Sequence, residues 1–146
     1  MADVSFYQAT ASTVEKVLPT LLEKIIGSGK RAVVVTSNEK RLKEIDDYLW
    51  TSPRFLPHGT AKDPNPNRQP VFITHKEENP SKAEILIVID GIVPEFAKDF
   101  ARVVDIYDGN NANDTAHAKQ RMDKYADGNK VVHYKQNPKG GWEAAA

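Results

Sequence analysis

Residues 32–51 read AVVVTSNEKRLKEIDDYLWT, and this stretch decides the fold class. Its first five residues form a β-branched apolar run, which is typical of a strand buried on both faces of a parallel sheet. Ser37 or Asn38 then provides the N-cap of a helix. The apolar seam of that helix is formed by Leu42, Ile45 and Leu49, and Trp50 ends the helix. A buried strand that leads into an amphipathic helix is the building unit of an α/β fold.

The alternation of strand and helix extends upstream of this stretch. Residues 4–9 indicate a strand, and Ser12 and Glu15 form a capping-box pattern at the start of a helix. Pro19 is expected to kink or shorten that helix, and Gly27 is expected to end it. The order from the N-terminus is therefore strand, helix, strand, helix.

The downstream half repeats the same elements after a proline-rich loop at residues 51–70. Strands are expected at residues 71–74, 84–89, 102–107 and 131–134, with a short helix from Pro94 and a longer one from Asn113 or Asp114 to about Ala126. The sequence thus predicts a single α/β domain at residues 1–138 and a Gly/Ala-rich C-terminal tail at residues 139–146. The expected architecture is a three-layer, mainly parallel sheet flanked by helices, Rossmann-like without a phosphate loop.

The composition limits the function classes. The 146 residues carry 20 basic and 20 acidic side chains and no cysteine, which excludes disulfides and fits a reducing cytoplasm. The longest apolar runs, at residues 32–35 and 85–89, are far shorter than a membrane span of ~20 residues, and the N-terminus lacks the basic region of a signal peptide. Without a basic excess, any contact with DNA is expected to be local or indirect, through another protein.

Two patterns that could indicate chemistry have simpler interpretations. GSGK at residues 27–30 is similar to a phosphate loop, but it follows a helix and precedes a strand, which favours a helix C-cap and turn. The histidines fall on separate predicted elements without metal-ligand spacing; they are His58, His75, His117 and His133. No metal or other cofactor is therefore expected, and His58, between Pro57 and Gly59, is expected to make a local hydrogen bond.

Asp90 directly follows the buried strand at residues 84–89, where a carboxylate can be catalytic in an α/β fold. The next residue is Gly91, however, and Asp-Gly is also an ordinary turn. Asp105 and Asp108 likewise lack a convergent partner in the sequence, so a structural role is favoured for these aspartates. The alternative hypothesis is a nucleotide-binding or hydrolytic α/β domain that uses the Asp90 end of the sheet.

Aromatic residues gather around the turn that follows the helix ending at Trp50. Trp50, Phe55 and Leu56 lie in the segment LWTSPRFLPHG at residues 49–59. Large aromatics near a loop either cover the core or anchor an interface, and the residues alone favour neither interpretation.

The helix at residues 114–126 has an apolar face beside a cationic one. The apolar face consists of Ala118, Met122 and Tyr125, and the cationic face consists of His117, Arg121 and Lys124, with Lys119 nearby. Two such strips could receive an acidic peptide with a hydrophobic end. The spacing alone favours an ordinary amphipathic helix with a solvated basic face.

In their order along the chain, these segments resemble the DNA polymerase III chi subunit family. The resemblance rests on VSFYQ (4–8), GKRAVVV (29–35), RLKEIDDYLWTSPRFLPHG (41–59), ARVVDIYD (101–108), AKQRMDKY (118–125) and GGWE (140–143). It covers nearly the whole chain, and the ordered set rather than any single motif is specific. It implies a non-catalytic accessory subunit whose fold is similar to nucleotide-binding α/β domains but lacks their phosphate loop.

The resemblance also implies partners. Chi subunits link the clamp-loader complex to single-stranded-DNA-binding protein (SSB) during DNA replication, and they bind the acidic C-terminal tail of SSB, which ends in phenylalanine. They also bind the psi subunit of the clamp-loader complex, and in some bacteria they pair instead with a helicase. This chain is therefore expected to bind the SSB tail and either psi, another clamp-loader component or a helicase.

The resemblance assigns candidate residues for the SSB tail by position. Lys119 matches a family arginine that contacts the acidic tail, and Arg121 and Lys124 are further cations on the same helix. Met122, together with a strand residue such as Val104, would form the pocket for the terminal phenyl ring.

The resemblance also assigns a second candidate surface, and the sequence departs from the family pattern at several positions. Trp50 and Phe55 match the aromatics that contact psi or the helicase. Thr115 stands where better-studied relatives have lysine, and Met122 stands where they have tyrosine. Because the lysine at position 119 cannot make the bidentate clamp of an arginine, the tail affinity is expected to be lower unless Arg121 compensates.

Overall fold

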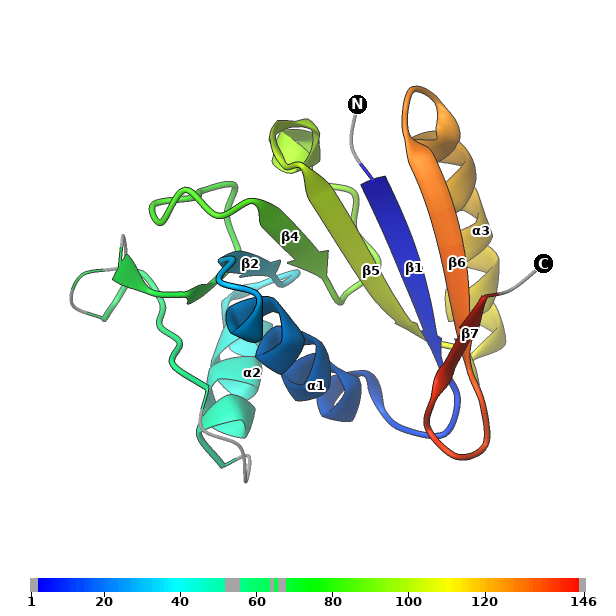
Figure 1. Cartoon of the computed structure of the whole chain (residues 1–146), viewed down its shortest axis with the longest axis horizontal. Helices are drawn as coiled ribbons and strands as arrows, with labels where there is room; N and C mark the ends of the chain where they lie inside the picture. The colour runs from blue at the N-terminus through cyan, green and yellow to red at the C-terminus, as the bar shows by residue number, and fades with distance from the viewer. Residues whose placement is uncertain (1–2, 52–55, 64, 66–67, 145–146) are drawn as a thin grey trace.

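A computed structural model describes residues 3–51, 56–63, 65 and 68–144 of the chain (Figure 1). Within these residues the elements are, in chain order, β1 (Asp3–Ala9), α1 (Val14–Gly27), β2 (Ala32–Val35), α2 (Glu39–Thr51), β3 (Val71–Thr74), β4 (Ile85–Val88), the 3-10 helix η2 (Glu95–Asp99), β5 (Arg102–Asp108), α3 (Ala112–Ala126), β6 (Lys130–Gln136) and β7 (Trp142–Ala144). They follow the order of strands and helices expected from the sequence, with β7 added at the end.

The strands form one sheet in the order β3-β2-β4-β5-β1-β6-β7. Every neighbouring pair is parallel except β6 and β7, which are antiparallel. Helices α1 and α2 lie on one face of the sheet, and α3 and η2 lie on the other (Figure 1). The expected α/β architecture, with a mainly parallel sheet between two helical layers, is therefore confirmed.

An apolar cluster on each face of the sheet forms the core. β2 and β4 are buried along their whole length, as their apolar runs predicted. One cluster takes its helical residues from α1 and α2, including Leu18 and Ile45, and the other takes residues from around η2 and from α3, including Phe100 and Ala118. Both faces of the central strands are thus removed from water, which is the main source of stability in such a sheet.

Helix α1 begins one residue later than the capping-box pattern predicted. Its N-cap is Thr13, whose Oγ1 accepts a hydrogen bond from the Lys16 amide at 3.2 Å. Ser12 instead binds Gln136: its amide donates to Gln136 Oε1 at 3.0 Å, and its hydroxyl accepts from Gln136 Nε2 at 3.3 Å. The cap is therefore displaced by a residue more than a hundred positions away, which no local pattern reveals.

Helix α2 begins as predicted, whereas α3 begins earlier. Asn38 caps α2 and accepts a hydrogen bond from the Arg41 amide at 2.8 Å. The N-cap of α3 is Asn111, which accepts from the Asp114 amide at 3.0 Å, rather than Asn113 or Asp114 itself. Several residues in this run can cap a helix, so the sequence pattern alone could not choose among them.

The turn after α1 has the role that the sequence favoured for GSGK at residues 27–30. The Lys30 amide donates to the Ile25 carbonyl at 3.2 Å, and Gly29 has a φ of +81°, as in a helix C-cap. α1 reaches this turn through Pro19, so the proline does not shorten the helix.

The expected C-terminal tail contains a strand. β7 pairs with β6, with Trp142 opposite Gln136, and the ring of Trp142 lies 5.0 Å from the ring of Tyr7, centroid to centroid. A strand of three residues carries too little periodicity to be recognised from sequence. The contact that holds it comes from the opposite end of the chain.

Candidate functional site

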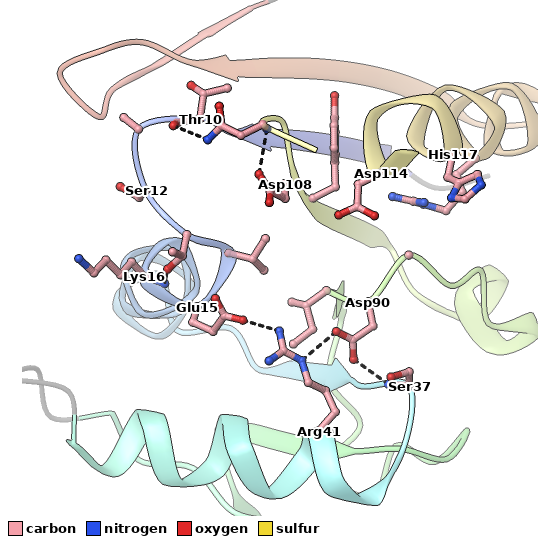
Figure 2. Close-up of a pocket in the computed structure, with 18 residues that line it drawn as sticks. Thr10, Ser12, Glu15, Lys16, Ser37, Arg41, Asp90, Asp108, Asp114 and His117 are labelled. Carbon is pink, nitrogen blue, oxygen red and sulfur yellow. Dashed lines mark hydrogen bonds and ion pairs between the residues drawn. The ribbon is translucent and has the colours of Figure 1, made fainter. Parts of the chain in front are cut away.

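A cavity of about 750 Å³ lies at the carboxyl ends of β1, β4 and β5 (Figure 2). Strand β1 leads into α1 on one face of the sheet, and its neighbour β5 leads into α3 on the other. The loops after these two strands therefore diverge, which is the place where open α/β sheets bind ligands. This is the edge that the alternative, nucleotide-binding hypothesis requires.

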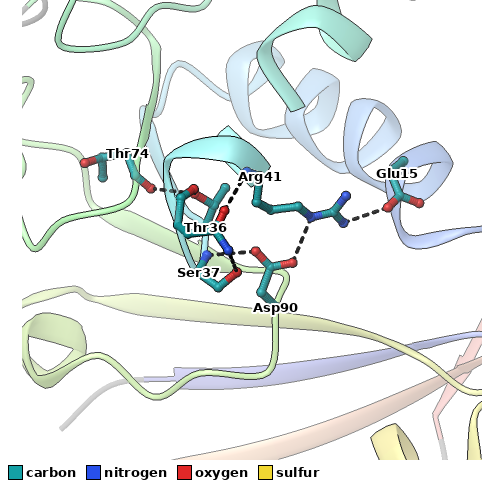
Figure 3. Close-up of polar contacts among 7 residues, drawn as sticks. Glu15, Thr36, Ser37, Arg41, Thr74 and Asp90 are labelled. Carbon is teal, nitrogen blue, oxygen red and sulfur yellow. Dashed lines mark hydrogen bonds and ion pairs between the residues drawn. The ribbon is translucent and has the colours of Figure 1, made fainter. Parts of the chain in front are cut away.

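The Asp90 carboxylate at this edge is fully engaged within the protein. Arg41 Nε donates to Asp90 Oδ1 at 2.9 Å, and the Ser37 amide donates to Asp90 Oδ2 at 2.8 Å (Figure 3). Arg41 Nη2 also reaches Glu15 Oε1 at 2.6 Å. Burial opposes ionisation of Glu15, but the hydrogen bond and charge of Arg41, together with hydrogen bonds from the backbone and from Thr13, outweigh burial and hold the Glu15 pKa below its usual value. This network ties α1, α2 and β4 together and agrees with the structural role favoured for Asp90.

The loop after β1 binds a side chain where nucleotide-binding domains bind phosphate. The amides of Thr10, Ala11 and Ser12 point at one atom, Gln136 Oε1, at 3.0, 2.9 and 3.0 Å. Consecutive backbone amides at the start of a helix form an anion-binding nest. Here the buried amide oxygen of Gln136 from β6 occupies it, so the position offers no free donors to a phosphate.

Arg121 is not part of the exposed cationic strip that was expected on α3. Its side chain is buried, and Nε and Nη2 donate to the two carboxylate oxygens of Asp105 at 2.8 and 3.0 Å. Asp105 lies on β5 and is 0% exposed, so this bidentate pair is a buried ion pair between the helix and the sheet. The charge of Arg121 is thus used inside the protein, because the aspartate that the sequence left without a partner lies beneath it.

The other candidate residues on α3 lie on two different flanks of the helix. Successive helical residues are rotated by about 100°, so Lys119 and Met122 lie roughly 60° apart, whereas Lys119 and Lys124 lie roughly 140° apart. Lys124 lines a hollow with Gly91 and His117, next to the connection after β4. Lys119 and Met122 therefore lie on the opposite flank, which borders β6.

The β6 flank of α3 adds residues that the sequence analysis missed. Lys119 is exposed, and Met122 is half-buried and packs on the same core cluster as Val131. Alternation along β6 places Val131, His133 and Lys135 on one face of the sheet. Burial, followed by the charge of Lys135, lowers the His133 pKa, which keeps the imidazole neutral beside an exposed cation. The period-2 pattern of β6 was the signal that could have found these residues.

Val104 cannot line a pocket with Met122. It belongs to the core cluster under α1, whereas Met122 packs against the cluster under α3, on the other face of the sheet. Val103 and Asp105 alternate with it and face α3. The expectation for Val104 was therefore wrong, because the sequence does not show which face of β5 the helix covers.

Trp50 is the large apolar side chain that stands out at the surface of the described residues, with 59% of it exposed. Its ring packs at 4.2 Å, centroid to centroid, against the buried ring of His58. His58 Nδ1 donates to the Leu56 carbonyl at 2.6 Å, and its Nε2 lies 3.2 Å from Asp46 Oδ1. His58 thus makes the expected local hydrogen bond and supports Trp50 from behind.

The two interpretations of the aromatic turn apply to different residues. Leu56 is buried in the core, whereas Trp50 presents one side to solvent in the manner of an interface anchor. Burial raises the pKa of Asp46, the carboxyl that faces His58. Phe55, the second residue assigned to this surface, lies outside the described residues.

In the part of the chain that the structure describes, no group of three or more His, Asp or Glu side chains is arranged to hold a metal ion. No helix there is long and apolar enough to cross a membrane.

Comparison with known proteins gives one consistent family. Residues 1–132 match the family model described as "DNA polymerase III chi subunit, HolC". A "Probable DNA polymerase III subunit chi" of Rickettsia prowazekii (strain Madrid E) is 30% identical over 156 residues, which covers 100% of this chain and 93% of that protein. A "DNA polymerase III subunit chi" of Haemophilus influenzae (strain Rd) is 27% identical over 96 residues, covering 64% of this chain and 67% of the relative.

The fold and the carboxyl edge define an α/β protein whose phosphate position is filled by its own Gln136. The comparisons then give the family: the chain belongs to the DNA polymerase III chi subunit family, as the order of its segments indicated. It is accordingly a subunit of the DNA polymerase III complex, which acts in DNA replication.

The buried ion pair gives a stability prediction. We expect Asp105→Asn to lower the free energy of unfolding by about 3–5 kcal/mol, because it leaves the Arg121 charge buried without its partner. Urea denaturation measures the change. The matched control is Asp123→Asn, an exposed aspartate on the same helix, which should stay within about 0.5 kcal/mol of the parent. Equal effects of the two variants would contradict a structural role for the pair.

The filled nest gives a ligand prediction. We expect ATP, GTP and NAD to leave the melting temperature unchanged, because the amides of residues 10–12 already bind Gln136. A ligand at a hundred times its Kd would stabilise the fold by about 2.7 kcal/mol, a rise of roughly 5 °C or more. Such a rise with any of the three would revive the nucleotide-binding hypothesis.

Proposed function

We propose that this chain links the clamp-loader complex to SSB during DNA replication in the cytoplasm, and that it performs no chemistry itself. Membership of the chi family supports the assignment to the replication complex. The engaged Asp90 and the filled nest argue against a catalytic or nucleotide-binding use of the carboxyl edge. The observation that carries the proposal is the exposed Lys119 beside the half-buried Met122, on a helix flank that borders β6.

The β6 flank of α3 suits an acidic peptide that ends in a large apolar residue. Lys119 and Lys135 supply positive charge for the carboxylates. Met122 and Val131 supply apolar surface for the terminal phenyl ring, since both pack at the edge of the same core cluster. We assign Arg121 a positioning role, because its guanidinium holds α3 against Asp105, and we place Lys124 at the periphery of the tail site.

The test is fluorescence anisotropy with a labelled peptide of the SSB C-terminus. We expect saturable binding that weakens with salt, because exposed charge pairs are screened. Lys119→Glu should weaken binding about ten-fold or more, because it replaces an attraction with a repulsion of similar size. A peptide without the final phenylalanine should bind much more weakly.

Lys43→Glu is the matched control, because Lys43 is exposed on α2 and lies away from α3. It changes the net charge as Lys119→Glu does and should leave the affinity within about two-fold of the parent. If the two variants behaved alike, the tail would not bind at this flank of α3.

We further propose that Trp50, with Phe55, binds the clamp-loader side of the assembly through psi or another component, or a helicase in its place. Trp50 combines a large apolar ring with a rigid support from His58, which is the usual character of an interface anchor. It lies on α2, at the opposite end of the sheet order from α3 and β6. Both partners could therefore bind at the same time.

We expect Trp50→Ala to raise the Kd for psi or the helicase by about 30-fold, the loss typical of an interface hot spot. The variant should therefore co-purify less of that partner. The same variant should bind the SSB peptide normally. Tyr48→Ala is the matched control, because it removes a half-buried aromatic from the same helix. Loss of the SSB peptide with Trp50→Ala would show that the two surfaces are not separate.

A further inference from the structure

Part of one sheet face is not covered by any helix of the residues that the structure describes. Helices α1 and α2 lie over the β2 and β4 side of that face, and no helix among the described residues lies in front of β1, β6 and β7 (Figure 1). Side chains of β2 and β4 are buried on both faces, whereas Val132 and Tyr134 of β6 are half-buried. A parallel sheet is normally covered on both faces, so this uncovered half-face is a candidate binding surface.

Three aromatic side chains lie together on the uncovered half-face. Tyr7 of β1 is directly opposite Tyr134 of β6, and their rings stack with centroids 5.1 Å apart and planes 25° apart. The ring of Trp142 from β7 meets Tyr7 edge-on, with centroids 5.0 Å apart. All three are half-buried, so they form a continuous aromatic surface that is open to solvent on its outer side.

Positive side chains border this aromatic surface. Arg102 shares the face with Tyr7, and its Nη2 lies 3.5 Å from the Tyr7 hydroxyl. The register Arg102–Asp3–Lys130 places a second exposed cation on the same row, with Asp3 between the two. Lys24 is about 180° around α1 from Glu15. Because Glu15 contacts α2 through Arg41, the exposed Lys24 lies on the flank of α1 that is turned away from α2.

The combination of stacked aromatics and nearby cations matches one class of ligand. Single-stranded nucleic acid is bound by aromatic rings that stack on bases, with basic side chains along the phosphates. On the row that they share with Asp3, the cations Arg102 and Lys130 outnumber the carboxylate, although the whole chain has no net charge. A flat sheet face with three rings offers little to a duplex, whose bases are already stacked on one another.

We propose that the uncovered half-face of β1, β6 and β7 binds single-stranded DNA directly. Bases stack on Tyr134 and Trp142, and Arg102, Lys130 and Lys24 contact the backbone. This goes beyond the adaptor role, in which contact with DNA is only indirect, and it is a local contact of the kind that the balanced charge of the whole chain allows. It does not depend on the SSB-tail site, which lies on the other face of the sheet.

The experiment titrates a fluorescein-labelled oligodeoxythymidine with the full chain, without SSB, at several salt concentrations. We expect saturable binding that weakens as salt rises. Tyr134→Ala should lower the affinity about ten-fold, and Tyr134→Phe, which keeps the ring, should restore it. Arg102→Gln should reduce the slope of log K against log salt by about 0.7, the value for one phosphate contact on a single strand.

Two controls separate this surface from general effects. Lys98→Gln removes an exposed charge on the other face of the sheet, and Tyr48→Ala removes an aromatic from α2; both should bind the oligonucleotide like the parent. Tyr134→Ala should still bind the SSB peptide, which shows that it is folded and that the two sites fail independently. Absence of oligonucleotide binding at low salt would overturn the proposal. An equal loss of oligonucleotide affinity in Tyr134→Ala and in the control variants would also overturn it. The same holds if a protein partner is found to occupy this face and to exclude DNA.

Discussion

The ion pair between Arg121 and Asp105 holds helix α3 against the sheet. The choice of α3 side chains that are exposed to a partner depends on that contact. An aspartate that is 0% exposed in the middle of a strand is tolerated only when a cation meets it with good geometry. Arg121 does so with two donors at 2.8 and 3.0 Å. Once this contact fixes the rotation of α3, Met122 lies on the flank toward β6, Lys119 is exposed beside it, and Lys124 faces the connection after β4. One buried pair therefore decides which cations are available to a partner.

A second constraint is that polar groups at the carboxyl edge of the sheet, where related architectures bind nucleotides, already bind one another. Arg41 joins Glu15 to Asp90, and Gln136 fills the nest formed by residues 10–12. Both contacts use the donors and acceptors that a ligand would need, and both also hold elements together: α1, α2 and β4 in one case, the β1 loop and β6 in the other. The polar groups at this edge of the sheet therefore serve to hold the fold together.

The parts that the sequence predicted are those governed by local patterns. Apolar runs identified β2 and β4, and helical spacing identified α1 and α2. The same reasoning failed where a distant residue decides the outcome. Gln136 displaces the first helix cap from Ser12 to Thr13, from more than a hundred residues away. Arg121 looked exposed because helical spacing places it beside other cations, and only the position of β5 reveals Asp105 beneath it.

The balanced net charge of the chain says little about its binding surfaces, because it also ignores which residues meet in the fold. A total of 20 acids and 20 bases describes the average field of the chain, but recognition depends on how charges are divided among faces. Burial removes Arg121 from that division, and Arg41 is neutralised by two carboxylates. Exposed cations occur on both faces of the sheet, among them Lys119 and Lys135 beside α3, and Arg102 and Lys130 on the other face. A chain with no net charge can thus still gather positive side chains locally, because the total charge does not say how charges are divided among faces.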